Sequence, residues 1–283
     1  IHKNAKILTI YKKKILDYLR KGGIPIVTGF QGIDTNERIK TIGRGGSDAS
    51  AIMLAKFFKA ERCIIYTDVE GVYTTDPNKL KKARKIKVIS YEEMLEMASL
   101  GAKVLHTRSV AMAMRHDVNL QVRSSFSNAP GTFVVDEDSI VEQEKISGIT
   151  YSPDEAKITI QGLPDQPGIA ASVFGQLADQ HVNVDMIVQS ASTDTKKTDI
   201  TFSIGRVDMK KAVGIIEQNR DILKYSGIEP TENVTKISVV GVAMRSQPGV
   251  AKTMFETLAQ KGVNLQVIST SEIKISVLIS SEY

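Results

Sequence analysis

Residues 43–48 bring together the residue types that bind anions in proteins. They are Gly-Arg-Gly-Gly-Ser-Asp, and apolar residues at helical spacing follow them. Glycines let the backbone approach a ligand closely, and the N–H groups at a helix start attract negative charge. Arg44 adds a guanidinium that matches a carboxylate. No Lys followed by Ser or Thr comes after the glycines, so the segment is not a Walker-type phosphate loop. We predict an anion-binding cradle. The alternative, a glycine turn in which Ser47 and Asp48 only cap a helix, leaves Arg44 unexplained.

A second polar cluster follows an apolar run at residues 63–67. Thr67 and Asp68 come at the end of the run, and a turn-rich loop with a tyrosine follows at residues 71–77. In open α/β sheets, ligands bind beyond the carboxyl ends of the strands. These residue types suit the base, ribose and phosphates of a nucleotide. A turn-rich loop without a ligand explains the same residues equally well, so both interpretations stay open on the residues alone.

A third cluster lies in the second half of the chain, between a predicted strand and a predicted helix. Residues 165–170 are Asp-Gln-Pro-Gly-Ile-Ala. Backbone N–H groups at such a helix start suit an α-carboxylate, and Asp165 could accept from an ammonium group. On the next predicted strand, Asn183, Asp185 and Gln189 share one face because their spacing is even. The pattern predicts a pocket for a free amino acid. The alternative is a simple Pro-Gly turn, with Asn183 capping a bend.

The elements that must position the first two clusters alternate between strands and helices. Short apolar runs predict strands, and apolar residues three and four apart predict helices. The predicted strands cover residues 24–28, 63–67, 120–122 and 132–135, and the predicted helices cover 47–60, 91–100 and 105–115. Ser90 followed by Glu93 predicts a capping box at the second helix. This order favours an α/β domain with a largely parallel sheet, followed by a polar linker at residues 136–145.

The chain beyond residue 147 contains an internal repeat. Gln166-Pro167-Gly168 returns 81 residues later as Gln247-Pro248-Gly249, and the apolar stripe of the next helix returns in the same register. Such a shared register indicates a duplicated module. The first copy is predicted to have strands at 157–161, 184–188 and 199–204 and a second helix at 209–223, which opens a ferredoxin-like βαββαβ unit. The second copy has strands at 236–240 and 265–268 and stops within a third strand at 274–279.

Composition restricts the class of protein. The chain has 283 residues, of which 42% are hydrophobic and 24% charged, as expected for two or three globular domains. The single Cys63 excludes an intrachain disulfide and favours a reducing, cytoplasmic setting. No apolar run reaches the roughly 18 residues of a membrane span, so no membrane partner is expected. The net charge is +5, and the densest basic run, at 79–87, lacks aromatic residues. We therefore expect a solvated loop and no nucleic-acid partner. The four histidines lack metal-ligand spacing, and no protein metal site is predicted.

The clusters together resemble the aspartokinases, a family with an amino-acid kinase domain and two C-terminal ACT domains. The resemblance rests on residues 43–48, on Tyr66-Thr67-Asp68 with the loop at 71–77, on Gly101-Ala102-Lys103, and on the repeat. It covers essentially the whole chain. It implies an α/β fold, with the C-terminal part of an amino-acid kinase-like parallel-sheet domain at residues 1–146. A first ferredoxin-like ACT domain at 147–230 and an incomplete second one at 231–283 would follow.

The resemblance implies phosphoryl transfer from MgATP to the β-carboxylate of L-aspartate, giving 4-phospho-L-aspartate, the first step of lysine, threonine and methionine biosynthesis. ATP and Mg²⁺ are the implied cofactors. A carboxylate is already ionised at neutral pH, so alignment and charge neutralisation suffice without a general base. The implied aspartate-binding residues are Gly43, Arg44, Gly45, Gly46, Ser47 and Asp48. The implied catalytic residues are Arg44, Ser47, Asp48 and Lys103. The implied ATP-binding residues are Thr67, Asp68, Tyr73, Thr74, Thr75, Asp76, Pro77, Asn78 and Lys103.

The ACT resemblance implies feedback regulation by lysine, threonine or both, bound between two copies of the chain. An incomplete ACT domain with an open strand edge also favours a homodimer through the repeats. The implied effector-binding residues are Asp165, Gln166, Pro167, Gly168, Ile169, Ala170, Asn183, Val184, Asp185, Gln189, Val250, Ala251, Asn264, Leu265, Ser271 and Glu272.

The chain departs from the family pattern at several points. Asn78 stands where the family commonly has arginine, and Ala251 where some relatives have threonine. The family's N-terminal Lys-Phe-Gly-Gly-Thr-Ser segment is absent, and both ends look cut. We therefore expect that this chain alone has no useful kinase activity. Two further interpretations stay open. One is a non-catalytic regulatory chain that binds amino acids, and the other is a kinase of another amino acid such as glutamate, which the repeats disfavour.

Overall fold

The computed structural model describes residues 7–102, 104–140, 145–192, 196–245 and 249–283. Lys103 therefore lies outside the described residues. The chain forms two compact units. The first contains Ile1–Thr150 together with Val240–Ala243, and the second contains Tyr151–Val239 together with Met244–Tyr283. None of the described helices is both long and apolar enough to cross a membrane. The expected boundaries after residues 146 and 230 stay predictions.

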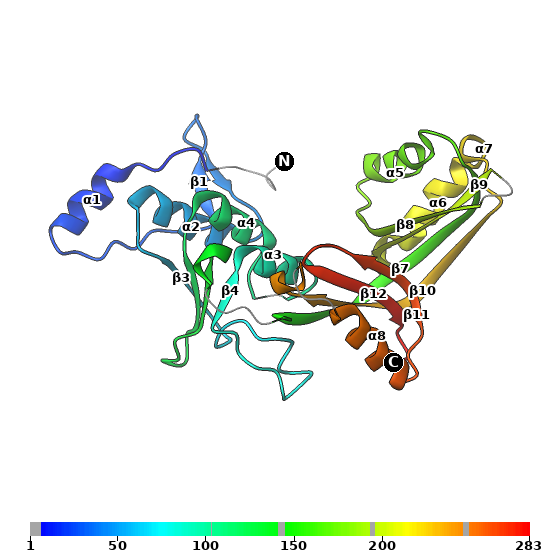
Figure 1. The fold of residues 1–283 in the computed structure, drawn as a ribbon. Helices are drawn as coiled ribbons and strands as arrows, with labels where there is room; N and C mark the ends of the chain where they lie inside the picture. Colours follow the sequence, from blue (N-terminus) through cyan, green and yellow to red (C-terminus); the bar gives the residue numbers. More distant parts are fainter. Residues whose placement is uncertain (1–6, 103, 141–144, 193–195, 246–248) are drawn as a thin grey trace. The chain divides into compact units, whose positions relative to one another are not determined.

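A four-stranded mixed sheet is the centre of the first unit (Figure 1). Its strands are β3 (Cys63–Thr67), β4 (Val88–Ser90), β5 (Leu120–Ser124) and β6 (Thr132–Val135), in the order β3-β5-β6-β4. β3 is parallel to β5 and β4 is parallel to β6, whereas β5 and β6 are antiparallel. The α/β fold is confirmed. The sheet is mixed because a short loop returns the chain from β5 directly to the neighbouring β6.

Three helices share a core with this sheet. They are α2 (Gly46–Phe58), α3 (Tyr91–Ser99) and α4 (Thr107–His116), all within two residues of the predicted ends. The core joins Ile52 of α2, Met94 of α3 and Val110 of α4 to Leu120 and Val122 of β5. The predicted capping box is also confirmed: Ser90 Oγ accepts from Glu93 N, and Glu93 Oε2 accepts from Ser90 N, both at 3.2 Å. A 3-10 turn, η1 (Glu137–Ser139), follows β6.

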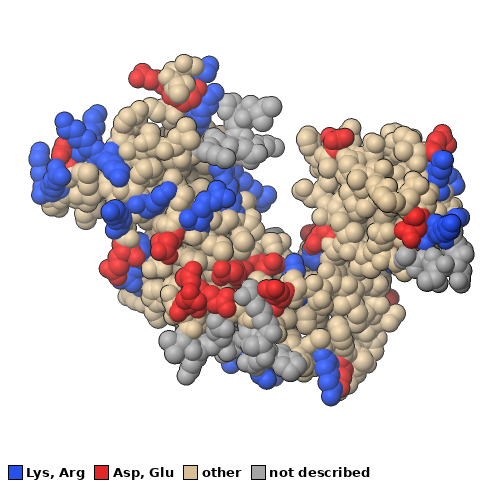
Figure 2. All heavy atoms as spheres, turned by 45° about the horizontal axis from the view of Figure 1, so that its top comes forward, with Lys and Arg blue, Asp and Glu red and all other residues tan. Residues whose placement is uncertain are grey.

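The chain before α2 differs from the prediction. Residues 24–28 form no strand, and Ile24 and Ile26 are 86% and 98% exposed. A strand needs a hydrogen-bonding neighbour, and none of the described strands lies beside these residues, so apolar composition alone was misleading. Two elements were not predicted: helix α1 (Lys12–Arg20) and the hairpin of β1 (Gln31–Ile33) and β2 (Ile39–Thr41). Figure 2 shows Lys and Arg side chains gathered over α1.

A six-stranded sheet is the centre of the second unit. Its order is β11-β12-β10-β7-β9-β8. The strands are β7 (Gly148–Pro164), β8 (Val184–Ser192), β9 (Lys197–Gly205), β10 (Gly227–Val240), β11 (Leu265–Thr270) and β12 (Lys274–Ser280). The long strands β7 and β10 extend well beyond the predicted 157–161 and 236–240. In each repeat the third strand lies between the first and the second: β7-β9-β8 and β10-β12-β11. β10 therefore closes the first ferredoxin-like module and opens the second.

Helices cover the first module. α5 (Ile169–Asp179) and α6 (Met209–Gln218) pack Val173 and Ile216 against Ile158 of β7 and Phe202 of β9. Phe174 contacts Phe202 edge to face at 5.4 Å. The predicted helix at 209–223 is interrupted at Asn219, where α7 (Arg220–Leu223) follows; short turns η2 (Arg206–Asp208) and η3 (Val242–Arg245) complete the connections. In the second module α8 (Val250–Gln260) buries only Val250 among its residues.

The repeat extends to backbone geometry. Gly168 and Gly249 cap α5 and α8 with φ values of 92° and 104°. A β-bulge follows Asp185 in β8, and another lies between Leu265 and Val267 in β11, at nearly the same place in each repeat. Two equal helices with equal caps and matching bulges confirm the duplication that the sequence predicts.

Candidate functional site

The predicted cradle is a turn that opens α2. Gly43 has φ 94° and Gly45, the N-cap, has φ 71°, conformations that favour glycine. Gly46 N donates to Gly43 O at 2.9 Å, which closes the turn. The side chains of Arg44 and Ser47 are exposed, and that of Asp48 is half-buried. A guanidinium, a hydroxyl and a carboxylate therefore surround the positive end of a helix, an arrangement suited to an amino acid's two charged groups.

The first turn of α4 holds this cradle in place, which the sequence did not predict. A Cβ on Gly45 would lie 2.9 Å from the Cβ of His106, so the two elements touch. Ser109 Oγ donates to Gly45 O at 3.3 Å, and Arg108 Nη1 donates to Ile42 O at 2.7 Å. His106 follows the Gly101-Ala102-Lys103 motif closely in the sequence, which was the available signal that it lies near the site. Local sequence patterns cannot show that it contacts Gly45, about 60 residues earlier.

Burial controls the electrostatics of the cradle. It raises the pKa of the Asp48 carboxyl, and the nearby His106 partly opposes this effect. Burial, together with the Asp48 charge, also raises the pKa of the Cys63 thiol to about 11. Cys63 is thus a neutral, buried thiol, which indicates a structural role. Asp48 is a half-buried carboxyl group, and an ammonium group of a ligand beside it would favour its charged form.

The predicted nucleotide residues form two groups. Thr67 Oγ1 donates to Asp68 Oδ1 at 3.0 Å at the carboxyl end of β3, and both residues lie where α/β proteins bind ligands. The turn that leaves this group is fixed by Thr132 of β6, whose Oγ1 accepts from Val72 N at 2.8 Å and donates to Ile86 O at 2.6 Å. Among the described residues, neither Thr67 nor Asp68 forms a hydrogen bond with the second group, which is the loop at residues 73–78.

The second group is the loop at residues 73–78. Asp76 Oδ1 accepts from Asn78 N at 2.9 Å, so this carboxylate shapes the turn in which Pro77 lies. Thr74 is bound on both sides: its Oγ1 accepts from Arg84 N at 3.0 Å, and its O accepts from Ile149 N at 2.7 Å. Tyr73 is half-buried, and its backbone forms an isolated antiparallel β-bridge with that of Lys85.

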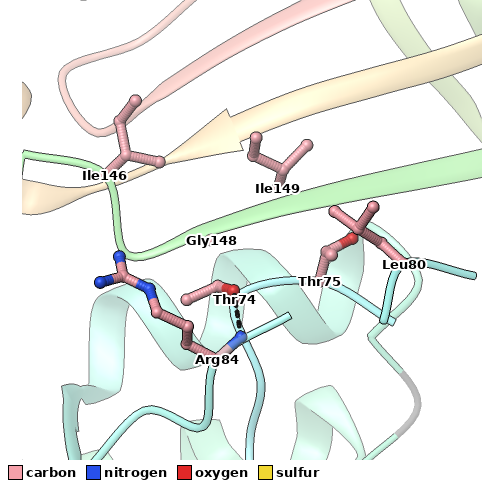
Figure 3. Close-up of a pocket in the computed structure, with 7 residues that line it drawn as sticks. All are labelled: Thr74, Thr75, Leu80, Arg84, Ile146, Gly148 and Ile149. Atoms are coloured by element: carbon pink, nitrogen blue, oxygen red, sulfur yellow. Dashed lines mark hydrogen bonds between the residues drawn. The ribbon is translucent and has the colours of Figure 1, made fainter. Parts of the chain in front are cut away.

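A cavity of about 300 Å³ lies beside this loop (Figure 3). Thr74 and Thr75 line it, and the guanidinium of Arg84 extends toward the segment of Ile146 and Gly148. The remaining lining residues are Leu80 and Ile149. The structure thus brings two of the predicted nucleotide residues to one concave surface and leaves Thr67 and Asp68 at the strand end.

The predicted effector residues gather at the helix starts and at the bulged strands. Residues 165–168 form the turn before α5, in which Asp165 N donates to Lys196 O at 3.0 Å. Asn183 and its counterpart Asn264 are both exposed where β8 and β11 begin, and Gln189 is exposed farther along β8. Ile169 and Val250 are buried at the first positions of α5 and α8, so their side chains anchor the helices. Ser271 N donates to Lys274 O in the turn before β12, a turn that also contains the exposed Glu272.

Asp185 has a partner that the sequence did not reveal. Its Oδ2 lies 2.8 Å from Lys236 Nζ, and Lys236 also contacts Glu155 Oε1 at 2.9 Å. Burial opposes ionisation of Asp185, but the hydrogen bond and charge of Lys236 outweigh it and hold the pKa of Asp185 below its ordinary value. The same carboxylates raise the pKa of the buried Lys236 against the effect of its own burial. The only available signal was a lysine within the predicted strand at 236–240.

Within the described ranges, no group of three or more His, Cys, Asp and Glu side chains is placed to hold a metal ion. This composition is compatible with Mg²⁺ that arrives with nucleotide phosphates, because such Mg²⁺ needs only one or two protein carboxylates. Asp68, at the end of β3, is the carboxylate in a suitable place.

Comparisons with known proteins agree with this architecture. Residues 2–124 match the model of the amino acid kinase family, and residues 158–219 and 237–283 match an ACT domain model. The fold and site thus define an amino acid kinase domain joined to a pair of ACT repeats. An aspartate kinase of Pseudomonas putida is 47% identical over 283 residues, which is 100% of this chain and 69% of the relative. The chain belongs to the aspartokinase family.

Solved structures support the same placement. Escherichia coli aspartokinase III in complex with aspartate and ADP, in its R-state, has a TM-score of 0.75 and 28% identity, over 95% of this chain and 60% of that one. The same enzyme in complex with lysine and aspartate, in its T-state, has a TM-score of 0.76 and 29% identity, over 95% of this chain and 59% of that one. The chain thus spans about three fifths of the length of these solved structures.

Proposed function

We propose that this chain belongs to an enzyme that phosphorylates the β-carboxylate of L-aspartate with MgATP, giving 4-phospho-L-aspartate, and that residues 1–283 alone have no useful kinase activity. The observation that carries the proposal is the cradle at residues 43–48, a glycine turn at a helix start held by α4, in a chain 47% identical over its whole length to an aspartate kinase. The attacking carboxylate is ionised at neutral pH. The protein therefore has to align two anions and neutralise the charge on the group in transfer.

The cradle assigns a role to each charged group of aspartate. The exposed guanidinium of Arg44 pairs with a carboxylate, and Ser47 supplies a hydroxyl beside it. The half-buried Asp48 accepts from the ammonium group, which supplies the positive charge that burial makes favourable. The first-turn N–H groups of α2 add attraction for the substrate's negative charge.

The nucleotide is proposed to lie between the end of β3 and the loop at 73–78. Thr67 and Asp68 face the phosphates, with Asp68 as a ligand of the Mg²⁺ that the nucleotide carries. Thr74, Thr75 and Pro77 shape the loop, Tyr73 and Asn78 contact the nucleotide, and Asp76 keeps the turn in its conformation. Lys103, for which the resemblance implies ATP binding and a catalytic role, completes the proposed set.

The ACT repeats are proposed to bind lysine, threonine or both as feedback effectors. The turns capped by Gly168 and Gly249 place backbone N–H groups at equivalent helix starts, suited to an α-carboxylate. The exposed Asn183 and Asn264 supply amides at equivalent strand starts. A homodimer through these repeats is part of the proposal.

Trapping of the acyl phosphate with hydroxylamine tests the proposal on the full-length polypeptide, with aspartate and glutamate as parallel substrates. Arg44→Ala is expected to raise KM for aspartate at least about tenfold, the effect of roughly 1.4 kcal/mol of lost binding. Arg20→Ala, which removes another exposed guanidinium from α1, is the matched control and should leave KM unchanged. An acyl phosphate trapped with glutamate but not with aspartate would contradict aspartate as the substrate. Lysine binding without any trapped acyl phosphate would indicate a regulatory chain instead.

A further inference from the structure

Glu93 of α3 does more than cap its helix. Glu93 is only 3% exposed, and each of its two carboxylate oxygens accepts two hydrogen bonds. Oε2 accepts from Ser90 N at 3.2 Å and from Ser90 Oγ at 3.3 Å, as a capping box requires. Oε1 accepts from Ser147 Oγ at 2.5 Å and from Val242 N at 2.9 Å. The second pair of bonds has no part in the capping of α3, so it needs another explanation.

The two extra donors belong to one structural feature, the paired end of β7 and β10. Ser147 immediately precedes β7 and Val242 follows β10 by two residues. Ser147 N donates to Val240 O at 2.8 Å, which holds the two chain segments together. A Cβ on Gly241 would lie 2.5 Å from Lys145 O, so the segments are also in tight backbone contact. We call residues 145–149 and 240–242 the ribbon end.

The ribbon end also contacts the proposed nucleotide loop. Ile149 N donates to Thr74 O at 2.7 Å, and Ile149 and Gly148 line the cavity with Thr74 (Figure 3). On the side of α3, a Cβ on Gly148 would lie 2.6 Å from Met97 Cε. The ribbon end is thus fixed to α3 by Glu93 and Met97, and to the nucleotide loop by Thr74.

Beyond the ribbon end, the chain continues into the proposed effector sites. β7 leads to the turn at Gly168, and the chain after Val242 leads through η3 to the cap of α8 at Gly249. In the other direction α3 packs on α4, whose His106 and Ser109 hold the cradle. The ribbon end therefore has covalent continuity with both effector loops and direct contact with the nucleotide loop through Thr74, and it is linked to the cradle indirectly, through α3 and α4.

We propose that Glu93 is the residue that couples effector binding in the ACT repeats to the kinase domain, by tying α3 to the ribbon end. The proposal rests on the effector-binding function proposed above. A displacement of β7 or β10 on effector binding would move Ser147 and Val242 relative to α3. Both residues donate to the same oxygen of Glu93, so the two bonds would break or re-form together. Glu93 is a positioning residue, since it touches neither substrate nor effector.

Hydrogen–deuterium exchange of the chain, with and without saturating L-lysine or L-threonine, tests this coupling. In the wild type, an effector should change exchange in α3 and at Ile149 about fivefold or more, the low end of typical allosteric coupling. In Glu93→Gln an amide NH₂ replaces one acceptor oxygen, so one pair of donors loses its partner. We expect this variant to keep the effector-induced protection of residues 165–170 and to lose the response in α3.

Two further variants make the test specific. Ser147→Ala removes one bond without altering Glu93, should reduce the α3 response in the same way, and serves if Glu93→Gln does not fold. Glu61→Gln removes a carboxylate at an exposed position of the same unit and should behave as the wild type. An α3 response that survives in both Glu93→Gln and Ser147→Ala, or is absent from the wild type despite protection of residues 165–170, would overturn the coupling role alone. Absence of effector binding to the wild type would overturn the proposed effector sites, and the inference with them.

Discussion

Lys236 is a buried charged residue of β10 that lies between the buried apolar residues Val234 and Val239. Its side chain is 7% exposed and bridges Glu155, whose side chain is 10% exposed, to Asp185. Burial of the Lys236 and Glu155 charges is costly, and the arrangement is tolerated because each has a partner within 3 Å, with the half-exposed Asp185 as the second partner of Lys236. The bridge joins β10, which both repeats share, to β7 and to the bulge of β8, where effector residues are proposed. It therefore fixes the position of Asp185.

Removal of Lys236 should be strongly destabilising. Lys236→Met fills similar space but leaves Glu155 buried without a counter-charge, so we expect a loss of about 3 kcal/mol in the free energy of unfolding. Urea denaturation followed by circular dichroism measures it. Lys252→Met on α8, where the side chain is 75% exposed, is the matched control and should stay within about 0.5 kcal/mol of the wild type. Equal stability of the two variants would contradict the buried bridge.

The pH dependence of stability should report the same bridge. The folded protein holds the pKa of Asp185 below the ordinary 3.8, so the unfolded chain binds this proton more tightly. The contribution of Asp185 to stability is therefore complete above about pH 4 and is lost as the pH falls through the folded-state pKa. Asp185→Asn should be less stable than the wild type at neutral pH, and the difference should shrink in acid. Chemical denaturation at pH 7 and at successively lower pH values measures this, with Asp17→Asn on α1 expected to follow the wild type. A difference that stays constant with pH would show that Asp185 is not stabilised by charge.

At the scale of elements, the caps of α5 and α8 make the repeat depend on glycine. Gly168 has φ 92°, and a Cβ added there would meet no atom within 4 Å, so backbone strain is the whole cost of substitution. Gly168→Ala should lower stability by about 1–2 kcal/mol. Gly175→Ala, an exposed position inside α5 that also has free space, should raise it by about 0.5–1 kcal/mol. Thermal melts measure the change in stability of each variant, which should have opposite signs. A destabilised Gly175→Ala would show that helix propensity does not determine the stability of α5.

Elements with a local signal were predictable and elements defined by partners were not. The capping box at Ser90, the helices α2, α3 and α4 and the glycine turns follow from spacing within a few residues, and the structure has them where expected. Helix α1 was not predicted, and the helix predicted at 209–223 is interrupted at Asn219. Residues 24–28 were wrongly predicted as a strand because a run of apolar residues does not specify a neighbour. The great length of β7 was missed for the opposite reason: its polar residues, such as Asp154, alternate poorly, but pairing with β10 supplies the hydrogen bonds.

The same division applies to the candidate site. Arg44, Ser47 and Asp48 were found because a cradle is built from consecutive residues. The groups that hold it, His106 and Ser109, come from another helix, and the donors to Glu93 come from Ser147 and Val242, up to 149 residues away. Sequence spacing reveals the residues that would touch a ligand. The residues that would transmit its presence lie together only in the fold.

At the scale of the whole molecule, the second unit is one sheet built from two repeats. β10 serves both modules, and Met186 of β8 packs against Val267 of β11 and Leu278 of β12. A ligand that orders one repeat therefore acts on strands that belong to the other. This continuity gives a physical reason for paired ACT modules to respond as a single body, with the ribbon end as its connection to the kinase domain.

The proposed homodimer can be tested at the exposed apolar side chains of β8 and β11. β8 and β11 end the order of the sheet, and their apolar side chains Ile187 and Ile268 are 52% and 43% exposed. β8 and β11 contact each other through Met186 and Val267, but the exposed side chains of Ile187 and Ile268 are favourable only when another surface covers them. Ile187→Asp should place an uncompensated charge in that surface and convert a dimer to a monomer at micromolar concentration, measured by sedimentation velocity. Val207→Asp removes an even more exposed apolar residue, 92% exposed in the short turn η2 and not in a strand, and should remain dimeric. A monomeric wild type, with or without lysine, or a dimeric Ile187→Asp, would contradict assembly through β8.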